Sequence, residues 1–425
     1  MCDAAVESSC VLSWAGIEPP VHFVNFAART QLVLRLPGFA GVLGCAFALG
    51  VGHSFVSPLF SLWGTQEIGM RPVVFGAFMT ANSLSAIVVA TVLARWSDTH
   101  VPRKIMLMVG AAAGAIGYSC YAFIRDPRIL VCIGMSVLAI AAVCFSQLFA
   151  HTRERYHAAD IPGVPVGFLT SVVRVCFSLA WTAGPSIGAW MMLQFGFRGV
   201  FLGAALLYLV LFFGVVRSVP FAPRTIQMRK AEHPPVWRIL TRADIFAVFL
   251  AFLLIFAAHT INMLNLPLVV TQLLGGSGWD VGITFGIGPL VEIPLMLWFG
   301  LLAARGHALG LIRFGVAATV LYFGLLIVAR EPWHIFPIQV LHGLSFAIIS
   351  NVGILFFQNL LPGQPGLATT IFTNAANVGN LVGFFSFGSL LVPLGHRRLF
   401  AVSGVLTAVT LAIMLLYRPR KTESS

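Results

Sequence analysis

Two ionisable side chains, Arg174 and Glu292, lie deep within long apolar runs of the sequence. A charge held in such a run is costly unless it is paired or hydrated, so both residues are functional candidates by default. A carboxylate that is only partly paired with a cation can load and release a proton. We therefore predict that Arg174 and Glu292 interact and form a proton-coupling pair. The alternative is a purely structural ion pair that joins two helices.

Neutral polar side chains recur at helical spacing in the same kind of run. Asn262 and Asn265 are three residues apart, and Asn374 and Asn377 repeat that spacing, so each pair lies on one face of a helix. Amides beside an aromatic ring suit a neutral ligand with many hydroxyls. Hydrogen bonding between helices is the alternative for each of them. The predicted ligand contacts are Asn82, Gln147, Arg174, Trp181, His259, Asn262, Asn265, Glu292, Asn351, Gln358, Asn374 and Asn377.

Three histidines, His53, His259 and His342, also fall within apolar runs. A neutral imidazole can carry protons near neutral pH, and a packing role is the alternative for each ring. No pair of them has metal-ligand spacing, so we expect no metal and no cofactor.

The composition places these residues in a membrane. Of 425 residues, 58% are hydrophobic and only 9% are charged, with a mean hydropathy of +0.92. Soluble domains carry about 25% charged residues, so this chain cannot cover a core with solvated side chains. The formal net charge of +12 would suggest a nucleic-acid partner in a soluble protein. Here the basic residues occupy short loops between apolar runs, so we expect a lipid bilayer as the partner and no nucleic acid.

Twelve apolar runs are long enough to cross a bilayer, which takes about 20 residues. The longest hydrophilic interruption, 217–244, divides them six and six and predicts two pseudo-symmetric halves with a site between them. The predicted spans are 36–62, 73–94, 105–123, 129–150, 166–193, 200–216, 245–270, 281–303, 311–328, 335–357, 367–392 and 399–416.

The domains follow from this division. We predict an N-terminal segment over 1–35, six-helix halves over 36–216 and 245–417, a linker over 217–244 and a tail over 418–425. Lys and Arg are retained on the cytoplasmic side of short loops, and most of them fall on the side of both termini. Both termini are therefore predicted to be cytoplasmic, in a multi-pass protein of the cytoplasmic membrane.

Two short motifs stand out between and within the apolar runs. Asp98 and Arg103 lie in the loop after the second run. In the fifth run, Gly184 and Gly188 form a pair of small residues that lets two helix backbones approach, and Pro185 between them bends the helix. Plain helix packing is the alternative for this second motif.

These motifs resemble those of the major facilitator superfamily. The loop over 98–104 resembles its signature between helices 2 and 3, although Ala94, Thr99 and Val101 depart from the pattern. In that signature an acid and basic residues latch the inner ends of the helices, so the resemblance implies a gating role for Asp98 and Arg103. The Gly-Pro motif resembles that of the superfamily's exporters, which implies a gating role for Gly184, Pro185 and Gly188. The strings over 261–268, 292–294 and 357–366 resemble the sugar efflux transporter family.

The resemblance implies an all-α integral membrane fold with twelve transmembrane helices in two halves. It implies a monomeric secondary active transporter that exports mono- or disaccharides by alternating access, with proton antiport. The alternative is a multidrug exporter of the same superfamily, whose pocket would be less rich in amides. Acids are too few and too scattered for an active site, so we do not expect an enzyme.

Overall fold

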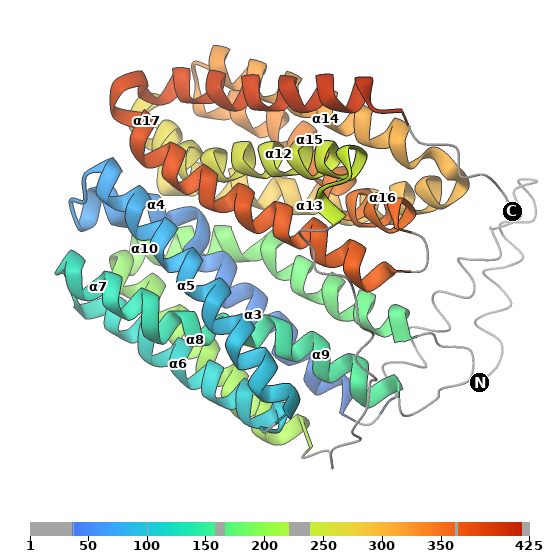
Figure 1. Cartoon of the computed structure of the whole chain (residues 1–425). Coiled ribbons are helices and arrows are strands. Elements are labelled where there is room, and N and C mark those ends of the chain that lie inside the picture. Colours follow the sequence, from blue (N-terminus) through green and yellow to red (C-terminus); the bar gives the residue numbers. More distant parts are fainter. Residues whose placement is uncertain are drawn as a thin grey trace, which may run out of the picture.

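The computed structural model describes residues 36, 38–99, 101–157, 166–220, 239–361 and 364–418. Throughout these ranges the regular elements are helices (Figure 1). The predicted N-terminal segment, the middle of the predicted linker and most of the predicted tail lie outside the described residues.

The N-terminal half is built from apolar runs that end at Pro, Gly or charged residues. Asp126, for example, caps the helix that starts at Pro127, because its carboxylate accepts a hydrogen bond from the Arg128 N–H. The elements are α3 (Phe39–Val56), η1 (Ser57–Leu59), α4 (Phe60–Leu62), the π turn η2 (Trp63–Glu67), α5 (Pro72–Thr99), α6 (Arg103–Phe123), α7 (Pro127–Ile133), the π turn η3 (Gly134–Leu138), α8 (Ala139–Ala141), α9 (Val143–His157) and α10 (Val166–Ser218).

The C-terminal half repeats this plan. Its elements are α12 (Ala243–Leu268), the π turn η4 (Val269–Leu273), α13 (Gly278–Leu302), the π turn η5 (Ala303–His307), α14 (Ala308–Val328), α15 (Pro332–Ala347), the π turn η6 (Ile348–Val352), α16 (Gly353–Leu360) and α17 (Pro365–Leu416).

Ten helical stretches of the described chain are long and apolar enough to cross a membrane. Two of them, α10 and α17, are each a pair of helices that meet at one glycine. Gly196 (φ 65°, ψ −171°) and Gly395 (φ 73°, ψ 170°) hold a backbone conformation that is essentially open only to glycine. Each break separates two predicted spans, so the all-α fold with twelve predicted transmembrane helices is confirmed.

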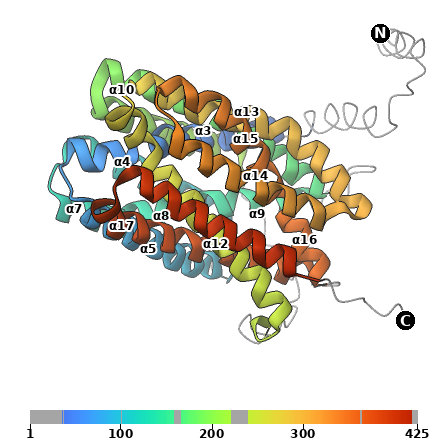
Figure 2. The same cartoon turned by 90° about the horizontal axis from the view of Figure 1, so that it is seen from above.

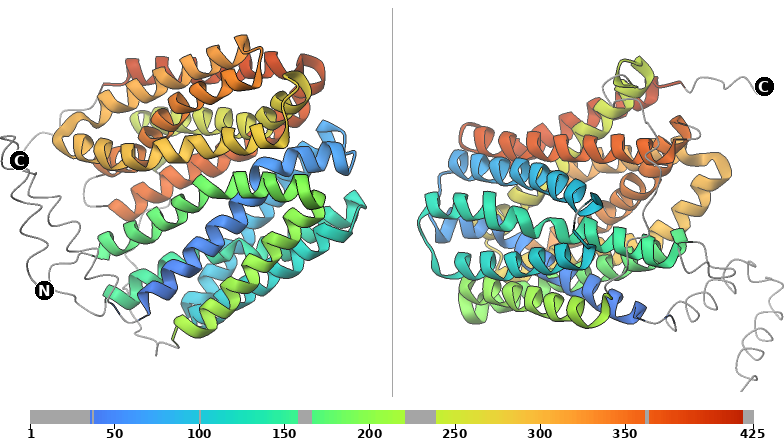
Figure 3. Two further views of the ribbon diagram at one scale, coloured as in Figure 1. Left: turned by 180° about the vertical axis from the view of Figure 1, so that it is seen from behind. Right: turned by 60° about the horizontal axis from the view of Figure 1, so that its bottom comes forward.

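The two halves lie side by side, the N-terminal half in blue to green and the C-terminal half in yellow to red (Figure 1). Views from other sides show that the helices of both halves run along one common direction (Figures 2 and 3). We call the end near Phe39 and Leu416 the terminal end, and the end near Glu67, Gly196 and Gly395 the far end.

The buried side chains form three clusters, and their placement differs between the two ends. At the far end one cluster spans both halves and includes Trp63 and Phe75 of the first half and Phe387 of the second. At the terminal end the two remaining clusters of described residues each draw on one half, around Leu107 and around Phe252. The halves are therefore joined at the far end and packed separately at the terminal end.

The far-end turns reveal an internal repeat. Thr65-Gln66-Glu67-Ile68-Gly69 after α4 matches Thr271-Gln272-Leu273-Leu274-Gly275 after α12. Both stretches close a π turn, and both glycines have positive φ, 73° and 71°. The two halves therefore share backbone geometry as well as helix order.

Candidate functional site

Helices α10 and α13 form one seam between the halves. A Cβ at Gly286 would lie 3.0 Å from the Thr182 carbonyl oxygen, and one at Gly282 would lie 2.9 Å from Ser186 Cα. The Ser186 hydroxyl also donates to the Gly282 carbonyl oxygen at 3.2 Å. Because backbones this close need small residues, the far-end part of this seam depends on its glycines.

The register of this seam bears on the predicted pair of charges. The two helices are antiparallel, and Gly286 of α13 faces Thr182 of α10. Eight residues after Gly286 and eight residues before Thr182, or about two turns along each helix, residue 294 is therefore level with residue 174. Position 174 is thus within about one turn of the level of Glu292. The Arg174 side chain lies outside the described residues, and its interaction with Glu292 stays a prediction.

Helices α5 and α17 form the second seam. A Cβ at Gly76 would lie 2.5 Å from Gly388 Cα and 2.8 Å from the Phe384 carbonyl oxygen. The rings of Phe75 and Phe387 meet edge to face beside this contact, with centroids 6.2 Å apart. This seam therefore also closes at the far end.

Glu292 lies on α13, partly buried, beside the π turn η6. The Ser350 hydroxyl donates to its Oε1 at 3.5 Å, which is a long contact. The neighbouring Asn351 donates instead to the Met296 carbonyl oxygen at 2.9 Å and so ties η6 to α13. Ser350 lies within η6, and π turns shift the register of a helix and are frequent at functional sites.

A polar cluster lies in the C-terminal half. The Tyr322 hydroxyl is within hydrogen-bond distance of Asn262 Oδ1 (3.2 Å) and accepts from the Gln339 amide at 3.1 Å. The His259 ring is 9% exposed, and neither of its nitrogens has a hydrogen-bond partner among the described residues. Its centroid lies 5.2 Å from that of His342. Asn262 is thus tied to a neighbouring helix, whereas His259 retains hydrogen-bonding capacity.

Trp181 and Asn82 occupy the N-terminal half. The Trp181 ring meets His53 edge to face, with centroids 5.6 Å apart. The Asn82 side chain faces Gly134 of η3, where a Cβ would collide with it, and its buried Oδ1 has no partner in the described structure. Both helices therefore present polar or aromatic groups that a ligand could use.

Three predicted ligand residues bond elsewhere. Gln147 is buried at the terminal end, where its Oε1 accepts from Arg103 Nη1 at 2.9 Å and from Ser97 at 3.1 Å. Asn265 bonds to His396 at the far end. Its Oδ1 lies 2.7 Å from His396 Nδ1, and its Nδ2 donates to the His396 carbonyl oxygen at 3.1 Å. Gln358 donates to Thr369 at 3.2 Å. The structure does not bring these three amides together with Glu292, and we leave them out of the proposed site.

Asn374 and Asn377 on α17 are partly buried and form no hydrogen bond within the described chain. The residues that the sequence reasoning missed are Tyr322, Gln339, Phe346, Ser350 and Asn380. The Phe346 ring lies 5.3 Å from the His259 ring between centroids, and Asn380 accepts from Thr260 at 2.8 Å. His342, Phe346 and Ser350 are four residues apart in turn, so helical spacing was the signal that could have found them.

Gly184, Gly188 and Arg103 contact helices of their own half, whereas Pro185 faces the other half. Ser54 of α3 lies where a Cβ at Gly184 would stand, and a Cβ at Gly188 would be 2.7 Å from the Phe55 carbonyl oxygen. These glycines thus allow the close helix approach that the spacing predicts, between α3 and α10. Pro185 lies in the same turn of α10, with its carbonyl oxygen facing Gly282. The Asp98 side chain lies outside the described residues, and Arg103 bonds to Gln147 as above.

Comparison with known proteins decides the family. A sequence profile of the Major Facilitator Superfamily matches residues 42–364. The chain belongs to the major facilitator superfamily. It is therefore a multi-pass membrane transporter, and the predicted fold, with its two six-helix halves, is that of the superfamily.

Within the superfamily, the chain is similar to proteins named sugar efflux transporter A. It is 31% identical to the protein of Dickeya chrysanthemi over 84% of this chain and 89% of the relative. It is 28% identical to that of Escherichia coli K12 over 88% of this chain and 94% of the relative. A crystal structure of a mutant of the nucleoside transporter NupG matches with a TM-score of 0.77 and 14% identity, covering 90% of this chain and 100% of that one. The last likeness concerns the fold alone.

Proposed function

We propose that this chain exports mono- or disaccharides across the cytoplasmic membrane by alternating access, in exchange for protons. The position of Glu292 carries the proposal. Its carboxylate lies on a helix of the seam between the halves, next to the Ser350 hydroxyl. The similarity to sugar efflux transporters over most of the chain supports the substrate class.

The orientation rests on the basic residues. Arg103, Lys104, Arg242 and Arg313 all lie at the terminal end. Because Lys and Arg are retained in the cytoplasm, this end faces the cytoplasm. The described form is then closed outside by the shared far-end cluster and faces inward, with the halves packed separately on the cytoplasmic side.

The exchange follows from the charge on Glu292. In the inward form, Glu292 releases its proton to the cytoplasm and sugar enters between the halves. After the far end opens, Glu292 takes a proton from outside and the sugar leaves. Arg174, level with this region on α10, is the proposed partner of the deprotonated carboxylate.

The sugar contacts come from both halves. Trp181 offers an aromatic face for the C–H groups of the sugar, which is a frequent use of aromatic rings in binding sites. Asn374, Asn377 and His259 offer hydrogen-bonding atoms that have no protein partner in the described structure. Such a neutral, amide-rich set favours sugar over a lipophilic cation.

Transport by the purified protein in proteoliposomes tests the substrate class. Labelled lactose, labelled glucose and a labelled lipophilic cation are compared in parallel, with empty liposomes as the control. We expect saturable movement of at least one sugar and none of the cation. Movement of the cation alone would support the multidrug alternative.

The Glu292→Gln variant tests proton coupling, with Glu331→Gln, an exposed acid at the far end, as the matched control. We expect Glu292→Gln to abolish sugar movement driven by a pH gradient while sugar exchange without a gradient continues. Unchanged pH dependence would show that Glu292 is not the coupling acid.

A further inference from the structure

Each half has an equivalent backbone carbonyl group at the far end, and a different arginine donates a hydrogen bond to it in each half. In the C-terminal half, Arg397 follows the break at Gly395 and donates to the carbonyl oxygens of Ile327 (3.3 Å) and Ala329 (3.1 Å). In the sequence repeat Ile124-Arg125-Asp126-Pro127 and Ala329-Arg330-Glu331-Pro332, the equivalent of Ala329 is Ile124. The Ile124 carbonyl oxygen accepts from Arg125 at 3.3 Å.

In the N-terminal half, Arg125 thus donates the hydrogen bond that Arg397 donates in the C-terminal half, so Arg198 is not needed for it. Arg198 follows the break at Gly196 just as Arg397 follows Gly395. It makes no side-chain hydrogen bond or ion pair within the described chain. The repeat shows a second difference, since Glu67 stands where the C-terminal half has Leu273. The equivalent turn of the C-terminal half therefore forms without an acid.

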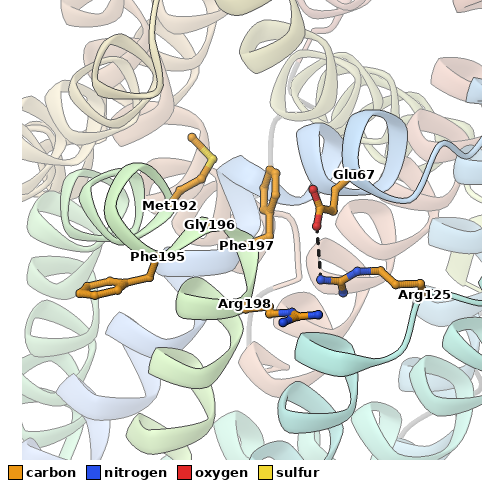
Figure 4. A pocket seen from close by; sticks show the side chains of 7 residues that line it. All are labelled: Glu67, Arg125, Met192, Phe195, Gly196, Phe197 and Arg198. Carbon is orange, nitrogen blue, oxygen red and sulfur yellow. Dashed lines mark ion pairs between the residues drawn. The ribbon is translucent and has the colours of Figure 1, made fainter.

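Glu67, Arg125 and Arg198 meet at one pocket of about 430 Å³, which we call the outer pocket (Figure 4). Arg125 Nη2 lies 3.2 Å from Glu67 Oε1, and the two side chains are 33% and 40% exposed. Phe197 and Met192 also line the pocket. The methyl group of Met192 packs over Gly278 of α13, so the outer pocket borders the seam between the halves.

We propose that the outer pocket is a second sugar-binding site, which holds the substrate on the outside of the membrane; this rests on the proposed function. The Glu67 carboxylate accepts hydrogen bonds from hydroxyls, the two guanidinium groups donate them, and the Phe197 ring covers a C–H face. Hydrogen bonds to charged groups are the stronger kind. The volume falls in the usual range of small-molecule pockets, and its position beside Met192 places the site where the seam must open for release.

Sided transport measurements test this site. One variant is Glu67→Leu, which introduces the residue type of the equivalent position Leu273, and the other is Arg198→Gln. The control is Arg330→Gln, because Arg330 is exposed and is the equivalent of Arg125 in the other half. Half-saturating sugar concentrations are measured on each face, in right-side-out and inside-out vesicles. We expect both variants to raise the outer value about tenfold, the loss typical of a hydrogen bond to a charged group. The inner value and both values of the control should stay within about twofold of wild type, well below that loss.

Each other outcome overturns the proposal. Equal changes on both faces would place the effect in the central pathway or in folding. No change on either face would leave the outer pocket without a role in sugar binding. A phospholipid that copurifies with wild type but not with Glu67→Leu, while both sugar constants stay unchanged, would identify a lipid site. If the wild-type protein moves no sugar at all, the proposed function is wrong, and the proposal for the outer pocket, which depends on it, is wrong as well.

Discussion

The glycine contact between α5 and α17 gives the sharpest test of how the far end closes. A Gly76→Ala side chain would lie 2.5 Å from Gly388 Cα and 2.8 Å from the Phe384 carbonyl oxygen. Carbon atoms pack at about 3.5–4.0 Å, so the helices must separate by roughly 1 Å. Overpacking of this kind costs about 1–3 kcal/mol. Because the clash exists only while the far end is closed, we expect the ratio of closed to open protein to fall by about 5- to 150-fold, at about 1.4 kcal/mol for each factor of ten.

Spin labels on opposite halves report this shift. Arg128 and Arg330 are exposed residues at the far end, one in each half, and are replaced by cysteine in a background without native cysteines. Pulsed dipolar spectroscopy then measures the distribution of distances between the labels. We expect Gly76→Ala to move most of the population to longer distances. Gly388→Ala should act in the same direction, because its Cβ would lie 2.8 Å from Gly76 Cα.

The matched control is Gly324→Ala in α14, where a new Cβ has no heavy atom within 4 Å. It raises helix propensity as Gly76→Ala does, without a clash. If Gly76→Ala and Gly388→Ala keep the wild-type distance distribution, the glycine contact does not hold the far end closed. If Gly76→Ala does not fold, the distance distribution is measured in Gly388→Ala instead, because the clash in that variant is milder.

Three further changes test contacts within the halves. Gly184→Ala should lower the midpoint of thermal unfolding because its Cβ would overlap the Ser54 hydroxyl, and Ser54→Ala should restore part of the loss; no rescue would refute this contact. Tyr322→Phe removes a hydroxyl bonded to both Asn262 and Gln339 and should destabilise the protein by about 1–3 kcal/mol, measured by thermal unfolding; a neutral effect would show that the buried amides find other partners. Gln147→Leu removes the acceptor of Arg103 and Ser97 and should slow transport without changing the half-saturating sugar concentration; a change in that concentration would return Gln147 to the substrate site.

The fold could be predicted largely from apolar run length, because a bilayer leaves a spanning segment few options other than a helix. The division at 217–244 and the twelve runs needed no further information. Run length predicts loops around residues 196 and 395, because it does not reveal that a single glycine with positive φ can join two helices.

The site was less predictable, because sequence spacing shows which residues share a helix face but not which neighbour that face meets. Asn262, Asn265 and Gln147 are all buried amides, yet each meets a different partner. Tyr322 lies in an apolar run, so the spacing of polar residues does not single it out, although its hydroxyl is the acceptor that joins three helices. Pairings of this kind depend on helix rotation and tilt, which are set by packing across the bundle.

The single-residue breaks in α10 and α17 also constrain how the protein enters the membrane. With one glycine between them, the paired helices have no loop that could wait at the far surface while the second helix inserts. We therefore expect each pair to enter the bilayer together as a helical hairpin. Both stretches are apolar enough to cross a membrane, which suits this route, because an apolar partner helix lowers the cost of carrying polar residues into lipid.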